Sequence, residues 1–483
     1  MSLHTIPLVI LIVYVVLTLV FANVVLRRRL GAEHYLAAGR ALPVFMVLAI
    51  ILGDWLGGGS TIGVCQRGYN EGIVAWLYPV SISIALFALA FTMSARYRRL
   101  GAVTIPEIMG RVFDAKTRLA SAIVIGLAYY ILAITQIIAG GALLAPLLGI
   151  DKWLADLIAA AIFLAIIAAG GLQSIALVNI VQCVVIYFGM LLGLFFSLHF
   201  IGGSVSAGFS MLFSELPSSF WSFEAISPVT WSGEMLSVVF TCFAAQAAVI
   251  GIFAAKDTKA AVRGTWMAAA LIIPIGVVYV IVGMCARIHY GPALPSGLTA
   301  GPAMMLALNP VVAGVALCGC LAAILSTGPL CFMAPTQILM RDIYAVYINP
   351  KASDKRVLLY SRVLATVLIM PGWLLGVTMY DLLGTIFWAF TLRVGIGVLL
   401  LTVTYLGARH ISEDGAFWGL IIGFLALITW TACGSPYGIH VAMPTVAAVL
   451  ITSLIISRFR KRKVELPAEV KEAMQSRRPP VTG

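Results

Sequence analysis

The stretch GDWLGGGSTIG at residues 53–63 lies inside an apolar run that is long enough to cross a membrane. It contains five glycines, and each glycine in a helix costs about 1 kcal/mol relative to alanine. We therefore predict that the helix breaks here, near the middle of the membrane. The alternative is an unbroken helix whose glycines allow close packing against neighbours. Residues 243–248, FAAQAA, are a second and weaker candidate for a break, because only their small size indicates one.

The whole chain is more apolar than a water-soluble domain. Of its 483 residues 61% are hydrophobic and 10% are charged, and the mean hydropathy is +1.05. This composition predicts an all-α polytopic membrane protein, because helices satisfy their own backbone groups in lipid. Apolar runs of sufficient length predict about thirteen transmembrane helices. Their approximate ranges are 6–26, 43–64, 72–95, 119–148, 153–169, 176–201, 235–254, 265–286, 311–340, 357–378, 382–406, 416–432 and 440–457.

The positive charges predict the orientation. Of the 31 Lys and Arg residues, 27 fall in alternate loops that the thirteen spans place on one side. Such loops are cytoplasmic in most membrane proteins, so the N-terminus is expected outside and the C-terminus inside the plasma membrane, which in a bacterium is the inner membrane. The first apolar run is expected to be a retained helix, since no cleavage site follows it. The net charge of +12 is then a topology signal and not a sign of nucleic-acid binding, and the basic tail 458–483 is expected in solvent beside anionic lipid.

Hydroxyl groups cluster in the middle of the ninth span. Ala323, Ser326 and Thr327 share one face of the helix, because they are three and four residues apart. Their hydroxyls, with a nearby carbonyl, offer neutral oxygen ligands that suit a small cation. Pro329 has no N–H and frees the carbonyl of Leu325. The alternative is that the hydroxyls only bond their own helix backbone.

Two charged residues, Asp54 and Arg393, lie deep in the predicted spans. A charge there costs at least about 2.5 kcal/mol and is usually functional or paired. Arg393 is expected to face the interior, where it either grips a substrate carboxylate or forms a structural ion pair with Asp54.

Several short motifs together resemble the sodium:solute symporter family, over about Glu33 to Ile456. They are the Gly-rich stretch 57–63, TIPE at 104–107, GGLQS at 170–174 leading to Gln182, FAAKD at 253–257, the run 323–327 and RDIY at 341–344.

The resemblance implies a LeuT-type core in which spans 2–6 and 7–11 are inverted repeats, with one extra helix before and two after. The expected units are an N-terminal helix and basic loop (1–35), the first repeat (36–201), an extracellular loop (202–234), the second repeat (235–406), two C-terminal helices (407–457) and a basic tail (458–483).

The family's sodium site lies between the broken helix and the ninth span. Carried over by position, its ligands are the carbonyls of Gly53, Leu56 and Ala323 and the hydroxyls of Ser326 and Thr327. A slip of one residue in the broken helix would substitute Leu52 and Trp55 for the first two.

The chain departs from the family pattern at two places. Many members have Thr-Asp after the Gly-Gly motif, whereas this chain has Val178-Asn179, so a carboxylate on the inner ion path is missing. Ile250-Gly251 replace a polar pair in the seventh span. The candidates for solute contact are the side chains of Ser60, Gln246, Trp388 and Arg393.

The expected function is sodium-coupled symport of a small organic solute, with a carboxylate or amino acid favoured, by alternating access. The partners are sodium, the solute and the lipid bilayer, and no obligate protein partner is implied. A proton-coupled transporter that uses Asp54 is one alternative. A membrane sensor is a weaker one, because the tail is too short for a signalling domain. An enzyme is the least favoured reading, since the histidines, carboxylates and eight cysteines form no catalytic constellation in the sequence.

Overall fold

The computed structural model describes residues 5–24, 40–169, 172–376, 381–462 and 465–475. Arg27 to Arg29, the two glycines of the GGLQS motif and the last eight residues of the tail lie outside these ranges.

The described residues are almost entirely helical, and their only β-contact is an isolated bridge between Leu42 and Ala255. The all-α fold class is therefore confirmed. The main helices are α1 (Thr5–Val24), α3 (Val44–Trp55), α4 (Val64–Glu71), α5 (Leu77–Thr92), α6 (Ser94–Leu100), α7 (Ile105–Val112), α8 (Ala115–Leu148), α9 (Lys152–Ala169), α10 (Leu172–Gly202), α11 (Val205–Glu215), α12 (Pro228–Cys242), α13 (Gln246–Phe253), α14 (Thr258–Tyr290), α15 (Ala300–Leu306), α16 (Pro310–Ile338), α17 (Asp354–Gly376), α18 (Leu382–Tyr405), α19 (Glu413–Ala432), α20 (Ala442–Phe459) and α21 (Ala468–Gln475). Shorter turns are the π-helices η2 (Gly59–Gly63) and η6 (Leu339–Ile348) and the 3-10 helices η3 (Gly72–Trp76), η4 (Ser218–Trp221), η5 (Phe223–Ala225), η7 (Ala408–His410) and η8 (Pro436–Gly438).

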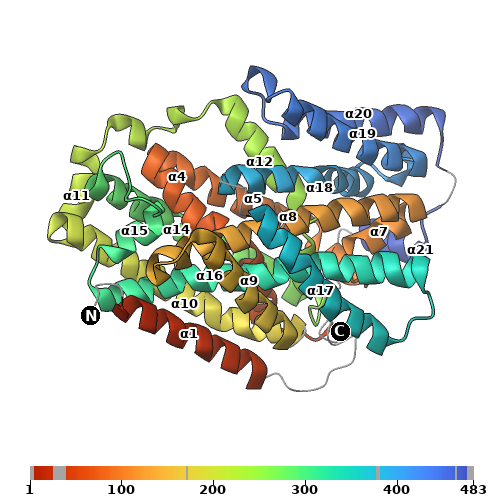
Figure 1. The fold of residues 1–483 in the computed structure, drawn as a ribbon. Helices are drawn as coiled ribbons and strands as arrows, with labels where there is room; N and C mark the ends of the chain where they lie inside the picture. The colour runs from red at the N-terminus through yellow and green to blue at the C-terminus, as the bar shows by residue number, and fades with distance from the viewer. Residues whose placement is uncertain (1–4, 25–39, 170–171, 377–380, 463–464, 476–483) are drawn as a thin grey trace.

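Eleven helical segments of the described chain are long and apolar enough to cross a membrane. The short apolar helix α3 and helix α9 cover predicted spans outside this set, so the count of thirteen stays a prediction. The long helices run side by side across the view of Figure 1, where α1 begins at the left and α20 ends at the right. Burial separates centre from periphery: 89% of the most apolar window of α18 is buried, against 17% in α1. Helices α16 and α18 therefore belong to the core, and α1, α19 and α20 lie at its edge.

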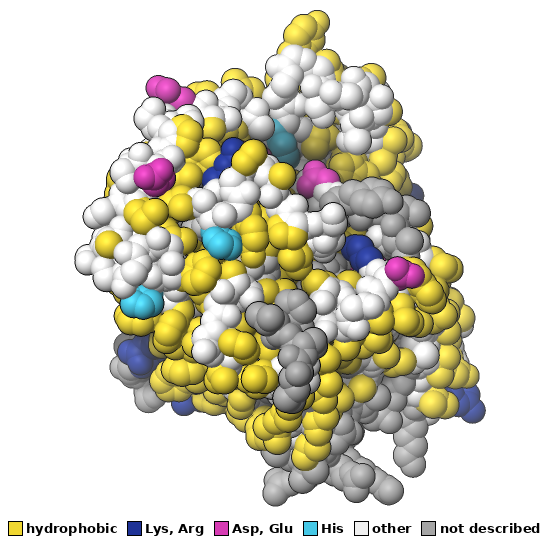
Figure 2. Space-filling model, turned by 60° about the vertical axis from the view of Figure 1, so that its left-hand side comes forward, with side chains coloured by type: hydrophobic (Ala, Val, Ile, Leu, Met, Phe, Trp, Pro, Cys, Tyr) yellow, Lys and Arg dark blue, Asp and Glu magenta, His cyan; other side chains and the backbone are white. Residues whose placement is uncertain are grey.

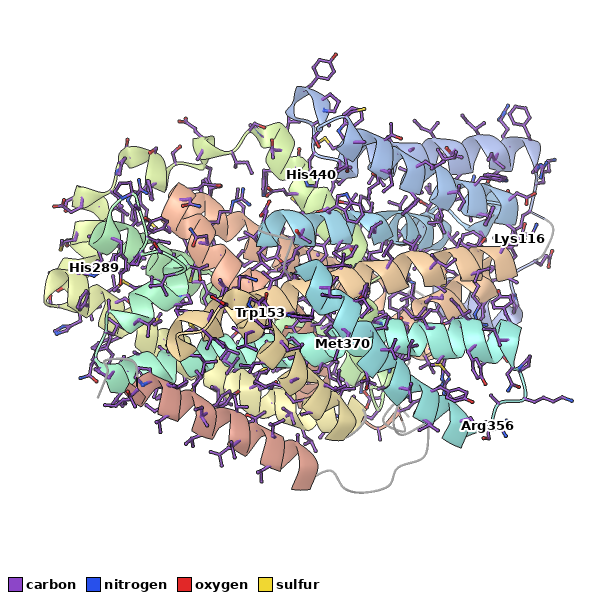
Figure 3. The ribbon with its side chains drawn as sticks, viewed as in Figure 1. Lys116, Trp153, His289, Arg356, Met370 and His440 are labelled. Carbon is purple, nitrogen blue, oxygen red and sulfur yellow. The ribbon has the colours of Figure 1, made fainter. Side chains whose placement is uncertain are left out.

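Labelled side chains identify the two ends of this bundle. Lys116 and Arg356 lie at the right-hand end in Figure 3, and His289 lies at the opposite end. We call the right-hand end, where α8 begins and α20 and α21 end, the basic end.

The second predicted span is interrupted, as the glycines predicted. Helix α3 ends at Trp55, Leu56 has a non-helical ψ of 58°, and the chain resumes in the π-helix η2 and in α4. Close packing is also present: a Cβ on Gly58 would come within 2.3 Å of the Cβ of Ala139 on α8. The predicted break is therefore present and the unbroken helix is not, although the glycines of the break do pack tightly against a neighbouring helix.

The seventh predicted span is interrupted in the same way. Helix α12 ends at Cys242 and α13 begins at Gln246, after Ala245 with a ψ of 81°. Tyrosine hydroxyls satisfy backbone groups at this break: Tyr97 donates to the Phe243 carbonyl at 2.5 Å, and Tyr129 accepts from the Ala247 N–H at 3.0 Å. Helices α3 and α13 pack against each other, so the two breaks lie close together.

The described part of the basic tail folds back onto the protein instead of lying wholly in solvent. Val470, Ala473 and Met474 of α21 are buried, and the Met474 carbonyl accepts a 2.8 Å hydrogen bond from Arg96 Nε on α6. Arg462 donates to the Val112 carbonyl at the end of α7. The sequence expectation of a solvated tail missed this packing.

The eight cysteines are all free thiols. Cys433, in the turn between α19 and α20, is exposed, Cys183 on α10 is half-buried and the other six are buried.

Candidate ion and solute site

The break after α3 faces the middle of α16. The Gly53 carbonyl accepts hydrogen bonds from Thr327 Oγ1 at 2.5 Å and from Ser326 Oγ at 3.4 Å. The same two hydroxyls lie 3.1 Å and 2.8 Å from the Ala323 carbonyl oxygen. Four of the five oxygen atoms proposed from the sequence thus meet in one place, and all belong to buried residues.

Leu56 is the fifth. Its own N–H bonds to Leu52 at 2.8 Å, and its carbonyl follows the last turn of α3. The contacts recorded for the described residues do not join this carbonyl to the other four. Since Gly53 itself contacts Ser326 and Thr327, the geometry favours the Gly53 register over the one-residue slip to Leu52.

Two side chains that the sequence analysis did not select support this site. Gln136 Oε1 on α8 accepts a 2.8 Å hydrogen bond from the Gly58 N–H, which the break leaves without a helical partner. Asn179 on α10 is buried and packs against Gly53, where an added Cβ would come within 2.0 Å of Nδ2. Gln136 could have been suspected, because it is an amide deep in an otherwise apolar span.

Gly57→Ala is expected to disturb the cluster. The new Cβ would lie 2.7 Å from Thr327 Oγ1 and 2.8 Å from Gln136 Oε1, so one polar group must move. Overpacking of this kind costs about 1–3 kcal/mol, and a cost of this size in the geometry that binds the ion would weaken its binding about five- to 150-fold. Gly126→Ala is the matched control, since nothing lies within 4 Å of its added Cβ. The melting temperature of each variant, measured over a series of sodium concentrations, checks this prediction. An equal response to sodium in the two variants would contradict an ion site at this cluster.

A small cavity adjoins the cluster. It has a volume of about 30 Å³, which holds one or two water molecules, and it lies between the break, α8, α16 and α18. Asp54, Ser60, Gln136, Thr327 and Arg393 supply polar groups to its wall. Thr327 therefore belongs both to the oxygen cluster and to the cavity.

Arg393 is almost completely buried, at 1% exposure. Its Nε donates to Thr241 Oγ1 at 2.5 Å, and its guanidinium lies 4.3 Å from the ring centroid of Tyr129. Nη1 is buried and has no hydrogen-bond partner. A buried charged donor without a partner is costly, so this group is suited to a ligand acceptor.

Asp54 and Arg393 line the same cavity but form no ion pair within 4.0 Å. Tyr129 lies between them, with its ring beside Arg393 and its hydroxyl donating to Asp54 Oδ2 at 3.3 Å. The direct pair that the sequence left open is therefore not formed, and the two residues share Tyr129 as a common neighbour.

Of the other candidates for solute contact, one lines the cavity and two do not. Ser60 lines the cavity, and its hydroxyl donates to the Trp55 carbonyl at 2.5 Å. Gln246 is buried elsewhere: it accepts from the Ile105 N–H at 2.8 Å and donates to the Val103 carbonyl at 3.1 Å. Trp388 turns toward α19 and donates to Thr431 Oγ1 at 3.2 Å. The structure brings Ser60 and Arg393 to the cavity, and it does not bring Gln246 or Trp388 there.

A vestibule of about 440 Å³ opens at the end of the bundle opposite the basic end. Its wall includes Arg67, which pairs with Glu234 at 3.1 Å, and Lys152. In Figure 2, which brings this end forward, charged side chains are few and widely spaced. Residues of α18 separate the vestibule from the cavity, since Phe387 lines the former and Ile386 and Phe390 line the latter.

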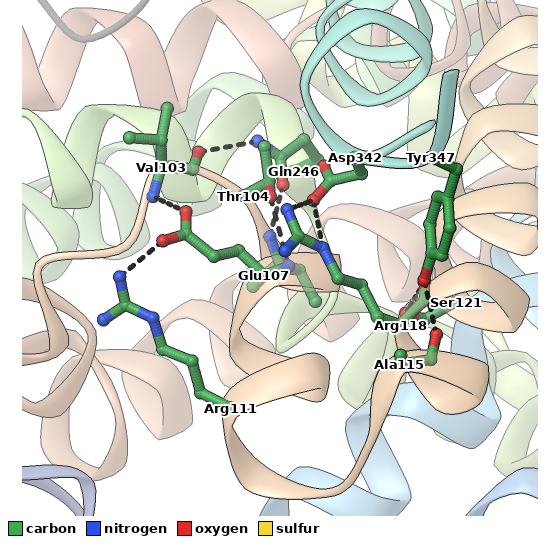
Figure 4. A network of polar contacts seen from close by, with 11 residues as sticks. Val103, Thr104, Glu107, Arg111, Ala115, Arg118, Ser121, Gln246, Asp342 and Tyr347 are labelled. Atoms are coloured by element: carbon green, nitrogen blue, oxygen red, sulfur yellow. Dashed lines mark hydrogen bonds and ion pairs between the residues drawn. The ribbon is translucent and has the colours of Figure 1, made fainter. Parts of the chain in front are cut away.

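A polar network joins the helices at the basic end, as Figure 4 shows. Arg118 at the start of α8 forms a 2.6 Å ion pair with Asp342 of η6, whose side chain is fully buried. Nearby, Gln246 of α13 bonds the loop before α7. These contacts tie together the elements that a pathway to this end would have to separate.

Arg118→Ala is expected to destabilise the protein by about 3–5 kcal/mol, because it leaves the Asp342 carboxylate buried without its partner. Arg118→Ala combined with Asp342→Ala should cost clearly less, since no orphaned charge remains. Chemical unfolding in detergent measures both. A double variant as unstable as the single one would show that the ion pair does not set the loss.

The chain is similar to several known transport proteins. A model of the sodium:solute symporter family matches residues 35–423. The osmoregulated proline transporter OpuE of Bacillus subtilis (strain 168) is 21% identical, covering 93% of this chain and 94% of that protein. The sodium/glucose cotransporter of Vibrio parahaemolyticus is 24% identical, covering 88% and 85%. The solved outward-open structure of a Na+-coupled sialic acid symporter aligns over 96% of this chain and 100% of its own, with a TM-score of 0.80 at 16% identity.

Proposed function

The chain belongs to the sodium:solute symporter family, and from this premise we propose that it couples sodium entry to the uptake of a small organic solute that carries a carboxylate. The family consists of transporters, so the work of the protein is to move its substrates and not to convert them. The bilayer surrounds it as a multi-pass membrane protein.

The oxygen cluster of Gly53, Ala323, Ser326 and Thr327 is our proposed sodium site, with the Leu56 carbonyl as a further ligand from the helix break. Neutral carbonyl and hydroxyl oxygens suit a small hard cation. The two hydroxyls can rotate their protons away from the carbonyls and turn lone pairs toward the ion. A bound ion would then hold the break against α16, which links ion binding to the position of α3 and α4.

The position of Thr327 is the observation that supports coupling between sodium and solute. Its side chain belongs both to the oxygen cluster and to the wall of the cavity. An ion that fixes Thr327 also fixes one wall of the cavity. Solute and sodium then bind more tightly together than apart, and by linkage each raises the affinity of the other equally.

The cavity suits a carboxylate, with Arg393 and Ser60 as its proposed contacts. Arg393 offers the unpartnered Nη1. Asp54 already offsets its charge, so a carboxylate entering with one sodium adds no net charge to the buried site. Among the relatives, proline and sialic acid carry carboxylates and glucose does not. An amino acid would further place its ammonium group near Asp54. Gln246 and Trp388 do not line the cavity and have partners elsewhere, so they are weaker proposals for solute contact.

Alternating access then follows from the two ends of the molecule. We propose that the vestibule faces outside and the basic end faces the cytoplasm, which places the N-terminus outside and the C-terminus inside the plasma membrane. The network around Arg118 and Gln246 closes the cytoplasmic end in this conformation. The repeats proposed for this cycle are 36–201 and 235–406, each with an interrupted helix.

A thermal-shift screen of the purified protein tests the function. Organic acids, amino acids and sugars are added with sodium and with potassium, and a coupled ligand stabilises by mass action, by about 2.7 kcal/mol at one hundred times its dissociation constant. We expect carboxylates to stabilise only with sodium, and the ligands so found to enter proteoliposomes along a sodium gradient. Uptake that ignores sodium and follows an imposed pH gradient would instead establish proton coupling through Asp54.

A further inference from the structure

A cavity at the basic end lies outside the proposed transport path. It measures about 1090 Å³ and is enclosed by the turn 406–409, the end of α20 and the described tail between 465 and 471. We call it the basic cleft. Five cationic residues line it against one carboxylate, that of Glu465. The cations are Arg409, Arg458, Lys461, Arg462 and Lys471.

The five cations have different roles. Arg462 builds the cleft: it donates to the carbonyls of Ala408 and Ile411, both at 3.3 Å, and lies 3.8 Å from Glu413. The ion pairs recorded for the described residues involve none of the other four. The cleft therefore presents an excess of positive charge around a hollow, and its ligand should be an anion.

The surface beside the cleft indicates which kind of molecule carries this anion. The last turns of α20 expose apolar side chains, with Ile455 at 54% and Phe459 at 81% exposure. Only 22% of the most apolar window of α20 is buried, as expected for a helix that faces acyl chains. Arg458 and Lys461 lie one and two positions from Phe459 in the chain, so cations and an apolar anchor meet at the end of α20. Such a pairing of a basic patch and an apolar surface matches an amphiphile better than a soluble ion.

We propose that the basic cleft binds the phosphate headgroup of an anionic phospholipid, with its acyl chains along α20. Arg409, Arg458, Lys461 and Lys471 hold the phosphate, and Arg462 holds the walls. Lys471 lies on α21, which packs on α6 through Met474 and Arg96. The lipid thus joins the tail to the end of α20, and the tail joins both to a helix of the transport core. Which leaflet of the membrane supplies this lipid depends on the orientation proposed above, and the rest of this proposal does not.

Native mass spectrometry of the full chain in detergent tests this, with phosphatidylglycerol and phosphatidylcholine as probes. The variant Arg409→Gln/Arg458→Gln/Lys461→Gln removes three cleft cations. The control Lys259→Gln/Arg263→Gln/Lys351→Gln removes three exposed cations elsewhere on the chain. Each cation near a headgroup is worth about fivefold in affinity, so the cleft variant should lose about a hundredfold in phosphatidylglycerol binding. The control should lose less than fivefold.

Three results would overturn the proposal: equal binding of the two lipids by the unaltered protein, equal losses in the two variants, or displacement of phosphatidylglycerol by millimolar pyrophosphate, which would identify a soluble anion as the ligand. If the triple variant does not fold, Lys461→Glu and Phe459→Ser replace it. Each should weaken phosphatidylglycerol binding at least fivefold, and unchanged binding in both would reject the site. Transport is not measured in this experiment, so its outcome is independent of the proposed coupling.

Discussion

Uptake by the double variant Ser326→Ala/Thr327→Ala is expected to lose its stimulation by sodium. The substitutions remove both hydroxyls that contact the Gly53 carbonyl and leave the carbonyls of Gly53 and Ala323 as the nearest oxygens. A hydrogen bond or ligand contact to a charged group is worth about 1.5–3 kcal/mol, so the loss of two should weaken sodium binding by about a hundredfold or more. Uptake into proteoliposomes across a series of sodium concentrations measures the effect.

The control for this prediction removes hydroxyls that bond only their own helix. Thr336 lies on the same helix α16 and donates to the Phe332 carbonyl at 2.9 Å, and Ser361 on α17 donates to the Val357 carbonyl at 2.7 Å. Thr336→Ala/Ser361→Ala should keep the sodium dependence of the unaltered protein. Full sodium dependence in the Ser326→Ala/Thr327→Ala variant would place the ion elsewhere.

Arg393→Gln is expected to abolish recognition of the solute while sodium still binds. Arg393 supplies the unpartnered cationic donor of the cavity and lies outside the oxygen cluster. Losing a charge-assisted contact of about 1.5–3 kcal/mol should weaken the binding of a carboxylate solute by about ten- to a hundredfold. Arg393→Lys keeps the charge without the planar fork and should recover only part of the affinity.

Thermal shifts measured with sodium alone and with sodium plus solute separate this role from a structural one. The prediction requires that Arg393→Gln keep the shift by sodium and lose the shift by the carboxylate. Because the substitution also leaves Asp54 without a nearby cation, Asp54→Asn/Arg393→Gln is the charge-neutral companion and should behave the same toward the solute. A solute shift that survives in both variants would assign Arg393 to packing against Tyr129 and Phe390.

The sequence was sufficient for those features that depend on local composition. Apolar runs located the long helices, glycines 57–59 located the break after α3, and the spacing of Ala323, Ser326 and Thr327 put three of the proposed ligands on one face. Each of these follows from helix periodicity or backbone propensity, which neighbouring residues determine.

Features that depend on how a helix is rotated in the bundle could not be predicted. Gln246 is a candidate because it lies in an interrupted helix, but it bonds the start of α7, 141 residues earlier in the chain. Trp388 and Arg393 are five residues apart on α18, and packing turns the first toward α19 and the second into the core. Tyr129, which lies between Asp54 and Arg393, comes from a helix that carries no pattern connecting it to either.

The distribution of thiols in this molecule gives direct experimental access to its conformational cycle. Cys433 is the one cysteine of eight whose side chain is exposed, and Cys183 is half-buried among the apolar residues between α3, α10 and α14. A water-soluble maleimide should therefore attach a single fluorophore to the natural protein, in the turn between α19 and α20. His440 in the same turn contacts Phe387 of the vestibule wall, with ring centroids 5.9 Å apart. We expect a dye at Cys433 to report, without any substitution, movements of the vestibule wall during the proposed transport cycle.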